Sequence, residues 1–135
     1  MRGDRLAMLT FVALTAVLIV GCGGQRPSKV TIDIHFSRFG PAAVSVPAGV
    51  PVTFALRNDD PIEHEWIVGT NEVHERHRSG AEPYHDQVPT EVTIPALASR
   101  LTTVTFNQPG EYAFICHLPG HEAYGMRGTL LVVAN

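Results

Sequence analysis

The chain has 135 residues, a formal net charge of −3 and 17% charged residues. This length accommodates one domain of ordinary size and leaves no room for two. The mild acidity argues against nucleic acid as a partner, because no basic stripe is available to neutralise phosphates.

The N-terminal segment resembles export machinery rather than part of a folded domain. Arg2 and Arg5 flank the start of an apolar run from Leu6 to Val20. At about 15 residues, this run is shorter than the roughly 20 that a helix needs to cross a hydrocarbon core. It leads into Ile19-Val20-Gly21-Cys22, which resembles the lipobox of bacterial lipoproteins. We therefore predict cleavage before Cys22 and lipidation of its thiol, with a plain membrane anchor as the alternative.

Lipidation of Cys22 divides the chain into three parts. Residues 1–21 are the predicted signal peptide, residues 22–29 the lipidated cysteine with a short tether, and residues 30–135 the domain. The protein is then exported and lipid-anchored to a membrane on its periplasmic or extracellular side. Cys116 becomes the sole remaining thiol in an oxidising compartment. Such a thiol tends to be oxidised unless it is buried or bound to metal, so Cys116 calls for an explanation.

From Val30 onward, apolar residues alternate or form short runs that Pro and Gly interrupt. In the first segment, Val30, Ile32, Ile34 and Phe36 are predicted to share one face, with His35 exposed on the other. Similar segments follow at 43–46, 52–56, 65–68, 91–94, 101–106, 111–116 and 129–133. About eight short strands without useful helical periodicity predict an all-β fold, an antiparallel sandwich or barrel.

The segment from Thr70 to Thr90 is the exception, because it is polar, rich in His and charge, and long for a hairpin loop. Residues 72–78 are predicted to form a short helix, on which His74 and His77 share one face. Together with His85, they are candidates for an auxiliary metal site. A solvated polar loop is the simpler interpretation, and whether these histidines bind metal stays open.

The segment from Cys116 to Met126 carries the strongest chemical signal. A thiolate, an imidazole and a thioether follow one another at intervals of five residues, at Cys116, His121 and Met126. Soft sulfur ligands combined with imidazole suit copper, and two His, one Cys and a weak axial Met form an electron-transfer site. Cys116 ends an apolar strand, and turns at Pro119-Gly120 and at Gly125 are expected to bring the other two ligands back toward it.

The fourth ligand has to come from elsewhere in the sequence. His64 is the best candidate, because it follows the strand break at Asn58–Pro61 and directly precedes the strand 65–68. A loop there is expected to hold the imidazole over one end of the sandwich, with Trp66 filling the core beneath. The predicted metal ligands are therefore His64, Cys116, His121 and Met126, holding one copper ion.

These motifs resemble the cupredoxins, in particular the bacterial plastocyanin- and azurin-like blue copper proteins. The resemblance covers most of residues 30–133 and rests on His64–Gly69, Pro109–Tyr112, Cys116–Met126 and the following Gly128-Thr129. It implies a Greek-key β-sandwich with one type 1 copper that cycles between Cu(I) and Cu(II). The two histidines and the cysteine are then equatorial ligands, and Met126 is axial. Glu65 departs from the pattern of many members, in which Asn follows the first histidine and braces the cysteine loop.

His117, next to the cysteine, has two interpretations. In multicopper oxidases a neighbour of the type 1 cysteine bridges to a second copper cluster. That cluster needs several His-x-His pairs, which this sequence does not contain. We therefore expect His117 to be exposed near the metal, on the path by which an electron enters.

Two functions are compatible with these ligands. The first is a single-electron carrier, which the lipid anchor holds near a membrane redox partner. The second is a copper-binding protein for tolerance, storage or delivery, which the loop histidines favour because an electron carrier needs no extra metal ligands. Oxidase or reductase chemistry needs an open metal position or a second copper, so we predict no enzymatic activity. We expect a monomer; the sequence identifies neither the partner nor the reduction potential.

Overall fold

The computed structural model describes residues 28–81 and 87–135, so the predicted signal peptide, Cys22 and His85 lie outside the described residues. The described chain forms β1 (Ser28–Ile34), β2 (Phe39–Gly40), β3 (Ala43–Pro47), β4 (Pro51–Asn58), β5 (His64–Gly69), α1 (Asn71–Ser79), β6 (Glu91–Ile94), β7 (Ser99–Thr105), β8 (Gly110–Ile115) and β9 (Arg127–Val133). Within those ranges, no helix has the length and apolar character needed to cross a membrane.

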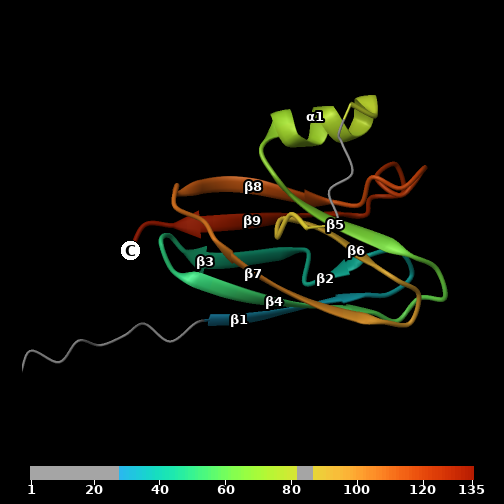
Figure 1. The fold of residues 1–135 in the computed structure, drawn as a ribbon, viewed down its shortest axis with the longest axis horizontal. Coiled ribbons are helices and arrows are strands. Elements are labelled where there is room, and N and C mark those ends of the chain that lie inside the picture. Colours follow the sequence, from blue (N-terminus) through green and yellow to red (C-terminus); the bar gives the residue numbers. More distant parts are fainter. Residues whose placement is uncertain (1–27, 82–86) are drawn as a thin grey trace, which may run out of the picture.

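The strands form two facing sheets, as Figure 1 shows. One sheet has the order β2-β1-β4-β7 and the other the order β3-β9-β8-β5-β6. The predicted all-β sandwich is confirmed, but its sheets are mixed rather than purely antiparallel. β1 pairs with β4, and β3 with β9, in parallel registers. These pairs arise because β3 joins the second sheet, so that β4 returns beside β1 in the same direction.

The inner faces of both sheets supply the core, as the alternation along the strands predicts. Phe54 of β4 and Trp66 of β5 meet between the sheets with ring centroids 4.8 Å apart, and Phe114 of β8 lies 6.4 Å from Trp66. All three side chains are fully buried, which confirms the core position of Trp66. Each contributes roughly 1.5–3 kcal/mol by burial, so this aromatic cluster holds the sheets together beneath the site.

Phe36 does not share the buried face of the first strand. It is 80% exposed, whereas Ile32 and Ile34 are fully buried. The strand ends at Ile34, and Phe36 and Ser37 both have a φ of 52°, in the left-handed region. Their amides donate hydrogen bonds to the Asp60 carboxylate, at 2.7 and 2.8 Å. The prediction for Phe36 is wrong because a carboxylate remote in sequence holds the backbone in a turn.

The predicted helix is confirmed and slightly longer than residues 72–78. α1 ends at Gly80, which has a φ of 67° and forms a left-handed cap. The helix follows β5 and lies over the sheet beside β8 in Figure 1. Its close approach depends on Gly69, because a Cβ there would lie 2.8 Å from Cβ of Val73. This contact sets how the histidines of α1 meet the sheet.

The two ends of the sandwich carry different parts of the chain. The loops that follow β1, β4, β6 and β8 lie at one end, on the right in Figure 1. The start of β1 and the C-terminus lie at the opposite end. Since β1 contains seven residues, about 20 Å of extended strand separates Ser28 from the loop end.

Candidate metal centre

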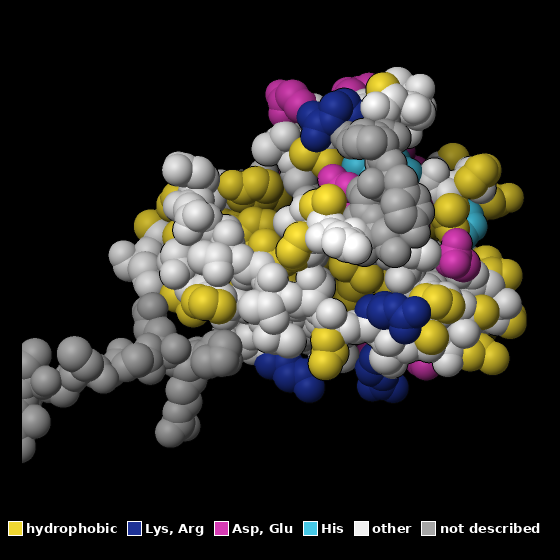
Figure 2. Space-filling model, in the orientation of Figure 1, with side chains coloured by type: hydrophobic (Ala, Val, Ile, Leu, Met, Phe, Trp, Pro, Cys, Tyr) yellow, Lys and Arg dark blue, Asp and Glu magenta, His cyan; other side chains and the backbone are white. Residues whose placement is uncertain are grey.

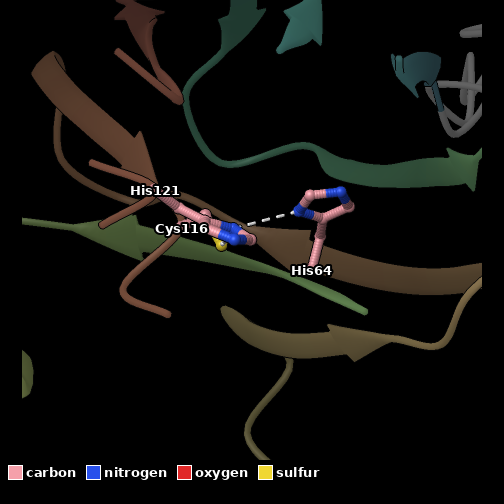
Figure 3. Close-up of side chains that lie close together, drawn as sticks. All are labelled: His64, Cys116 and His121. Atoms are coloured by element: carbon pink, nitrogen blue, oxygen red, sulfur yellow. Dashed lines mark hydrogen bonds between the residues drawn. The ribbon is translucent and has the colours of Figure 1, made fainter. Parts of the chain in front are cut away.

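Three of the predicted ligands converge at the loop end of the sandwich. His64, Cys116 and His121 each offer a donor atom within 4.8 Å of the others, and Figure 3 shows their side chains gathered at one point. The Nδ1 atoms of His64 and His121 are 3.2 Å apart, and His121 Nδ1 lies 3.3 Å from Cys116 Sγ. Two donors about 2.0–2.3 Å from one ion lie roughly 3–3.5 Å apart, so these separations fit shared coordination.

Strand pairing brings His64 beside Cys116. β5 and β8 are antiparallel neighbours, with Ile67 opposite Ile115. His64 is the first residue of β5 and Cys116 directly follows β8, so both lie where paired strands meet the loops. The Glu65 amide donates a hydrogen bond to Cys116 Sγ at 3.3 Å. Residue 65 therefore braces the sulfur through its backbone, a contact that Glu makes as well as Asn.

The loop from β8 to β9 is folded by its own backbone. The His121 amide bonds to the Leu118 carbonyl at 3.0 Å, and Gly125 forms the second bend with a φ of 86°, which favours glycine. Met126 then closes the loop: its amide donates to the His121 carbonyl at 3.0 Å, and its carbonyl accepts from the Cys116 amide at 3.2 Å. Met126 is fully buried in the same core cluster as Cys116. The structure thus brings all four predicted ligands to one end.

A buried carboxylate orients His64. Nε2–H of His64 donates to Oδ2 of Asp60 at 2.9 Å, which leaves Nδ1 facing the site. Burial disfavours the ionised Asp60, but hydrogen bonds from the Ser37 and Phe36 amides and from His64 outweigh this effect and lower the pKa. Carboxylate–histidine pairs of this kind fix the tautomer of a metal ligand. The sequence pattern did not predict Asp60 as a site residue, although Asp60 lies in the strand break just before His64.

Asn58 holds the segment that carries Asp60. Its side-chain amide donates to the carbonyls of Ile62 and Pro95, at 2.7 and 2.9 Å, and its Oδ1 accepts from the Asp60 amide at 3.0 Å. These bonds satisfy a buried polar side chain and tie two loops together. The bracing residue in this protein therefore lies at the end of β4, six positions before the histidine.

Burial sets the protonation of the donor groups. It raises the pKa of the Cys116 thiol, although hydrogen bonds from the Glu65 and Leu118 amides act in the opposite direction. Burial, followed by the charge of His64, lowers the pKa of His121. The imidazole is consequently neutral at pH 7, the form that binds metals. A cation next to Cys116 reverses the cost of the thiolate, so metal binding and thiol ionisation are coupled.

This donor set fits copper. Thiolate and thioether are soft ligands, and imidazole completes the combination that copper electron-transfer sites use. The nearby carboxylate of Asp60 bonds to His64 rather than pointing into the group, so the site lacks the oxygen ligands that magnesium or calcium requires. One copper ion is the cofactor that these residues fit.

The histidines of α1 do not lie in a solvated loop. His74 is 1% exposed, and its Nδ1 lies 3.0 Å from Nε2 of His117. The ring of His77 stacks on His117 at a centroid distance of 5.2 Å. The prediction that His117 is exposed is wrong: its side chain is 6% exposed, because α1 packs against it. His35, by contrast, is exposed as predicted.

The sequence of this chain matches a known protein family. Residues 6–132 match the family model of the cupredoxin-like domain. The chain belongs to the cupredoxin-like family. The resemblance inferred from the ligand motifs is thereby confirmed, and the sandwich with its site at one end is the family's fold in this sequence.

Two relatives and a solved structure illustrate the similarity. The chain is 34% identical over 111 residues to the copper-resistant cuproprotein CopI of Rubrivivax gelatinosus, covering 80% of this chain and 67% of that protein. It is 33% identical over 109 residues to auracyanin-B of Chloroflexus aurantiacus, covering 70% of this chain and 46% of that protein. A solved structure of auracyanin B matches with a TM-score of 0.66 at 25% identity, covering 81% of this chain and 91% of that one.

Proposed function

We propose that this cupredoxin holds one type 1 copper between His64, Cys116, His121 and Met126 and transfers single electrons through it. The observation that carries the proposal is the convergence of three donors within 4.8 Å on strand ends and a hydrogen-bonded loop. A rigid cage of soft ligands restricts the geometric change between Cu(I) and Cu(II), which favours fast electron transfer. With Met126 as the fourth ligand, the site would offer no open position for a substrate, so the proposal is a carrier rather than an enzyme.

An apolar surface at the metal end supports docking to a redox partner. Phe36, Ile62, Leu97 and Tyr124 are all exposed, and they lie in the four loops that follow β1, β4, β6 and β8. Figure 2 shows hydrophobic side chains gathered at this end, on the right. Apolar groups exposed together mark interaction surfaces. His121 is the one proposed ligand that is not fully buried, which makes it the route by which an electron would leave or enter.

The position of Ser28 supports the proposed lipid anchor. Because β1 starts at the end opposite the site, a tether attached there leaves the apolar surface free to face a partner. We propose that the protein is exported and anchored through Cys22. Fractionation of cells that express Cys22→Ser tests this: the variant should leave the membrane fraction, and a variant that stays membrane-bound would contradict the anchor.

A second function, copper tolerance or delivery, is favoured by the buried pair of His74 and His117. A polar pair beside the cysteine has no evident use in a carrier. The relative in Rubrivivax gelatinosus is named a copper-resistant cuproprotein, which supports the same alternative. Both functions use the same four ligands, so the type 1 site alone does not separate them.

The separating experiment combines two measurements on one variant. His74, His77 and His85 are replaced together by Gln, and electron self-exchange of the copper-loaded protein is measured by NMR line broadening. Copper tolerance is measured in cells that carry the same variant. The carrier proposal predicts fast self-exchange and unchanged tolerance. Unchanged self-exchange combined with lost tolerance would assign the protein to copper handling instead.

A further inference from the structure

His74 and His117 repeat the imidazole contact of the metal centre. Their facing nitrogens, Nδ1 of His74 and Nε2 of His117, are 3.0 Å apart, compared with 3.2 Å between His64 and His121. Two nitrogens that each lie about 2.0 Å from one ion, at angles near 90–110°, are roughly 2.8–3.3 Å apart. The spacing therefore fits two ligands of a single metal ion.

The outer nitrogen of each ring faces an acceptor. Nε2–H of His74 donates to the carbonyl of Ala113 at 3.2 Å. Nδ1 of His117 lies 3.7 Å from Oε2 of Glu122, and Arg78 holds that carboxylate with two hydrogen bonds, at 2.6 and 2.9 Å. When both protons are on the outer nitrogens, the two inner lone pairs are directed at each other and are available to one metal ion. Carbonyl and carboxylate acceptors behind metal-binding imidazoles serve this purpose in known sites.

Each imidazole binds a metal ion in its neutral form, with one proton on one of its two nitrogens. Without a metal ion, Nε2–H of His117 donates to Nδ1 of His74, because the proton of His74 is on Nε2 and faces the Ala113 carbonyl. A metal ion between the rings would require the His117 proton to move to Nδ1, on the side of Glu122. Both imidazoles then stay neutral, and no proton is released.

A cavity gives access to the pair. A hollow of about 300 Å³ is lined by His77, Arg78, His117, residues 118–120, Glu122 and Ala123. It reaches the His117 side of the pair, whereas His74 is sealed between α1 and the sheet. An ion can approach from solvent on one side, and the hollow has room for the water molecules that would complete its coordination.

We propose that His74 Nδ1 and His117 Nε2 bind a second copper ion, as Cu(II). Imidazole suits copper, and Cu(II) binds nitrogen donors more tightly than the other divalent first-row metals. His77 does not belong to this site: its Nδ1 donates to the Val73 carbonyl at 2.9 Å, and its Nε2 lies 3.8 Å from Glu91. The donors thus differ from the set of loop histidines suggested by sequence.

The second site is joined directly to the first. Cys116 and His117 are consecutive, so one peptide unit, with Cα atoms about 3.8 Å apart, connects a ligand of each site. The second copper does not depend on whether the first carries electrons. It would explain why a polar pair is buried beside the cysteine.

The test is a Cu(II) titration of the copper-free protein, followed by visible absorption and electron paramagnetic resonance. The wild type should bind two equivalents: one with an intense thiolate band, and one with a weakly coloured, nitrogen-coupled signal. His74→Gln and His117→Gln should each keep the thiolate band and weaken the second equivalent at least tenfold, as expected for loss of a ligand. His77→Gln, on the same helix face, is the matched control and should bind both equivalents.

Other outcomes decide against the proposal. A full second equivalent in both His74→Gln and His117→Gln, or its loss in His77→Gln as well, would overturn the assignment. Binding of Zn(II) but not Cu(II) at the pair would overturn the choice of metal. If neither ligand variant folds by circular dichroism, Glu122→Gln tests the same site and should weaken the second copper about 10–100-fold; unchanged affinity there contradicts the proposal.

The two metal sites fail separately. Cys116→Ser should abolish the thiolate band and leave the nitrogen-coupled second copper in place. A missing thiolate band in folded wild-type protein, with the second copper still bound, would sink the proposed type 1 function alone.

Discussion

The metal centre and the His74–His117 pair differ less in their imidazoles than in what surrounds them. In each, two ring nitrogens lie about 3 Å apart. In each, one ring also donates from its other nitrogen to an oxygen: His64 to the Asp60 carboxylate and His74 to the Ala113 carbonyl. The centre adds Cys116 and Met126, which are buried and held by the backbone of the β8–β9 loop. The pair has no sulfur donor; it opens on a water-accessible hollow instead.

This difference assigns separate chemistry to each region. Sulfur donors in a closed, hydrogen-bonded loop suit an ion that stays bound while it changes oxidation state. Two imidazoles at an open hollow suit an ion that enters and leaves. The two proposed sites would then combine a permanent copper with an exchangeable one, and the following variants test how independent the two are.

The largest expected effect comes from the two histidines of the centre. His121→Gly should lose the thiolate band, and added imidazole should restore it, because His121 is partly exposed and its removal opens the site to solvent. His64→Gly should lose the band without rescue, because His64 is fully buried. Absorption with and without imidazole makes the measurement; equal rescue of both variants would contradict the buried position of His64.

Removing the charge behind His64 should have the next largest effect. Asp60→Asn can keep an oxygen for the Phe36 amide, but its NH2 group then replaces the oxygen that accepts from the Ser37 amide and from His64 Nε2–H. Loss of such an orienting partner lowers metal affinity about 10–100-fold. Competition with a chelator measures this affinity, and the second copper should bind as in the wild type. A parallel loss at both sites would mean that the variant acts through the fold.

Gly69→Ala is expected to weaken the second copper site and to spare the first. The added Cβ would lie 2.8 Å from Val73, so α1 has to shift away from the sheet. Overpacking of this kind destabilises by about 1–3 kcal/mol. Thermal unfolding measures the loss, and binding of the second copper should weaken while the thiolate band persists. Unchanged unfolding and copper binding would show that α1 does not need this close approach.

The smallest effect is expected at the ion pair between Arg78 and Glu122, which links α1 to the ligand loop. Arg78→Gln removes it, and because both side chains are partly exposed, the expected loss is at most about 1 kcal/mol. Denaturant unfolding should detect this small change without change in the thiolate band. A loss of several kcal/mol would show that the pair holds the ligand loop in place.

Much of this architecture could be predicted from sequence because its signals are local. Alternating apolar residues locate the strands, and the spacing of Cys116, His121 and Met126 reports a loop that folds on itself. The turn at Gly125 and the helix in the 70–90 segment are equally local. Each depends on residues a few positions apart, whose preferences survive in the folded protein.

What the sequence did not show depends on contacts between remote segments. The Asp60 carboxylate turns the chain at Phe36, and α1 covers His117, which adjoins the proposed metal ligand Cys116. The parallel pairing of β1 with β4 follows from the path of β3 between the sheets. None of these contacts leaves a periodic pattern, so they emerge only when the strands are assembled.

The most direct test of the central claim is visible absorption during Cu(II) titration of the wild type and of Cys116→Ala. We expect an intense thiolate-to-copper band in the wild type that saturates with one copper per chain, and its complete absence in the variant. Correctly folded wild-type protein that develops no such band, or a band that persists in Cys116→Ala, would contradict the type 1 site.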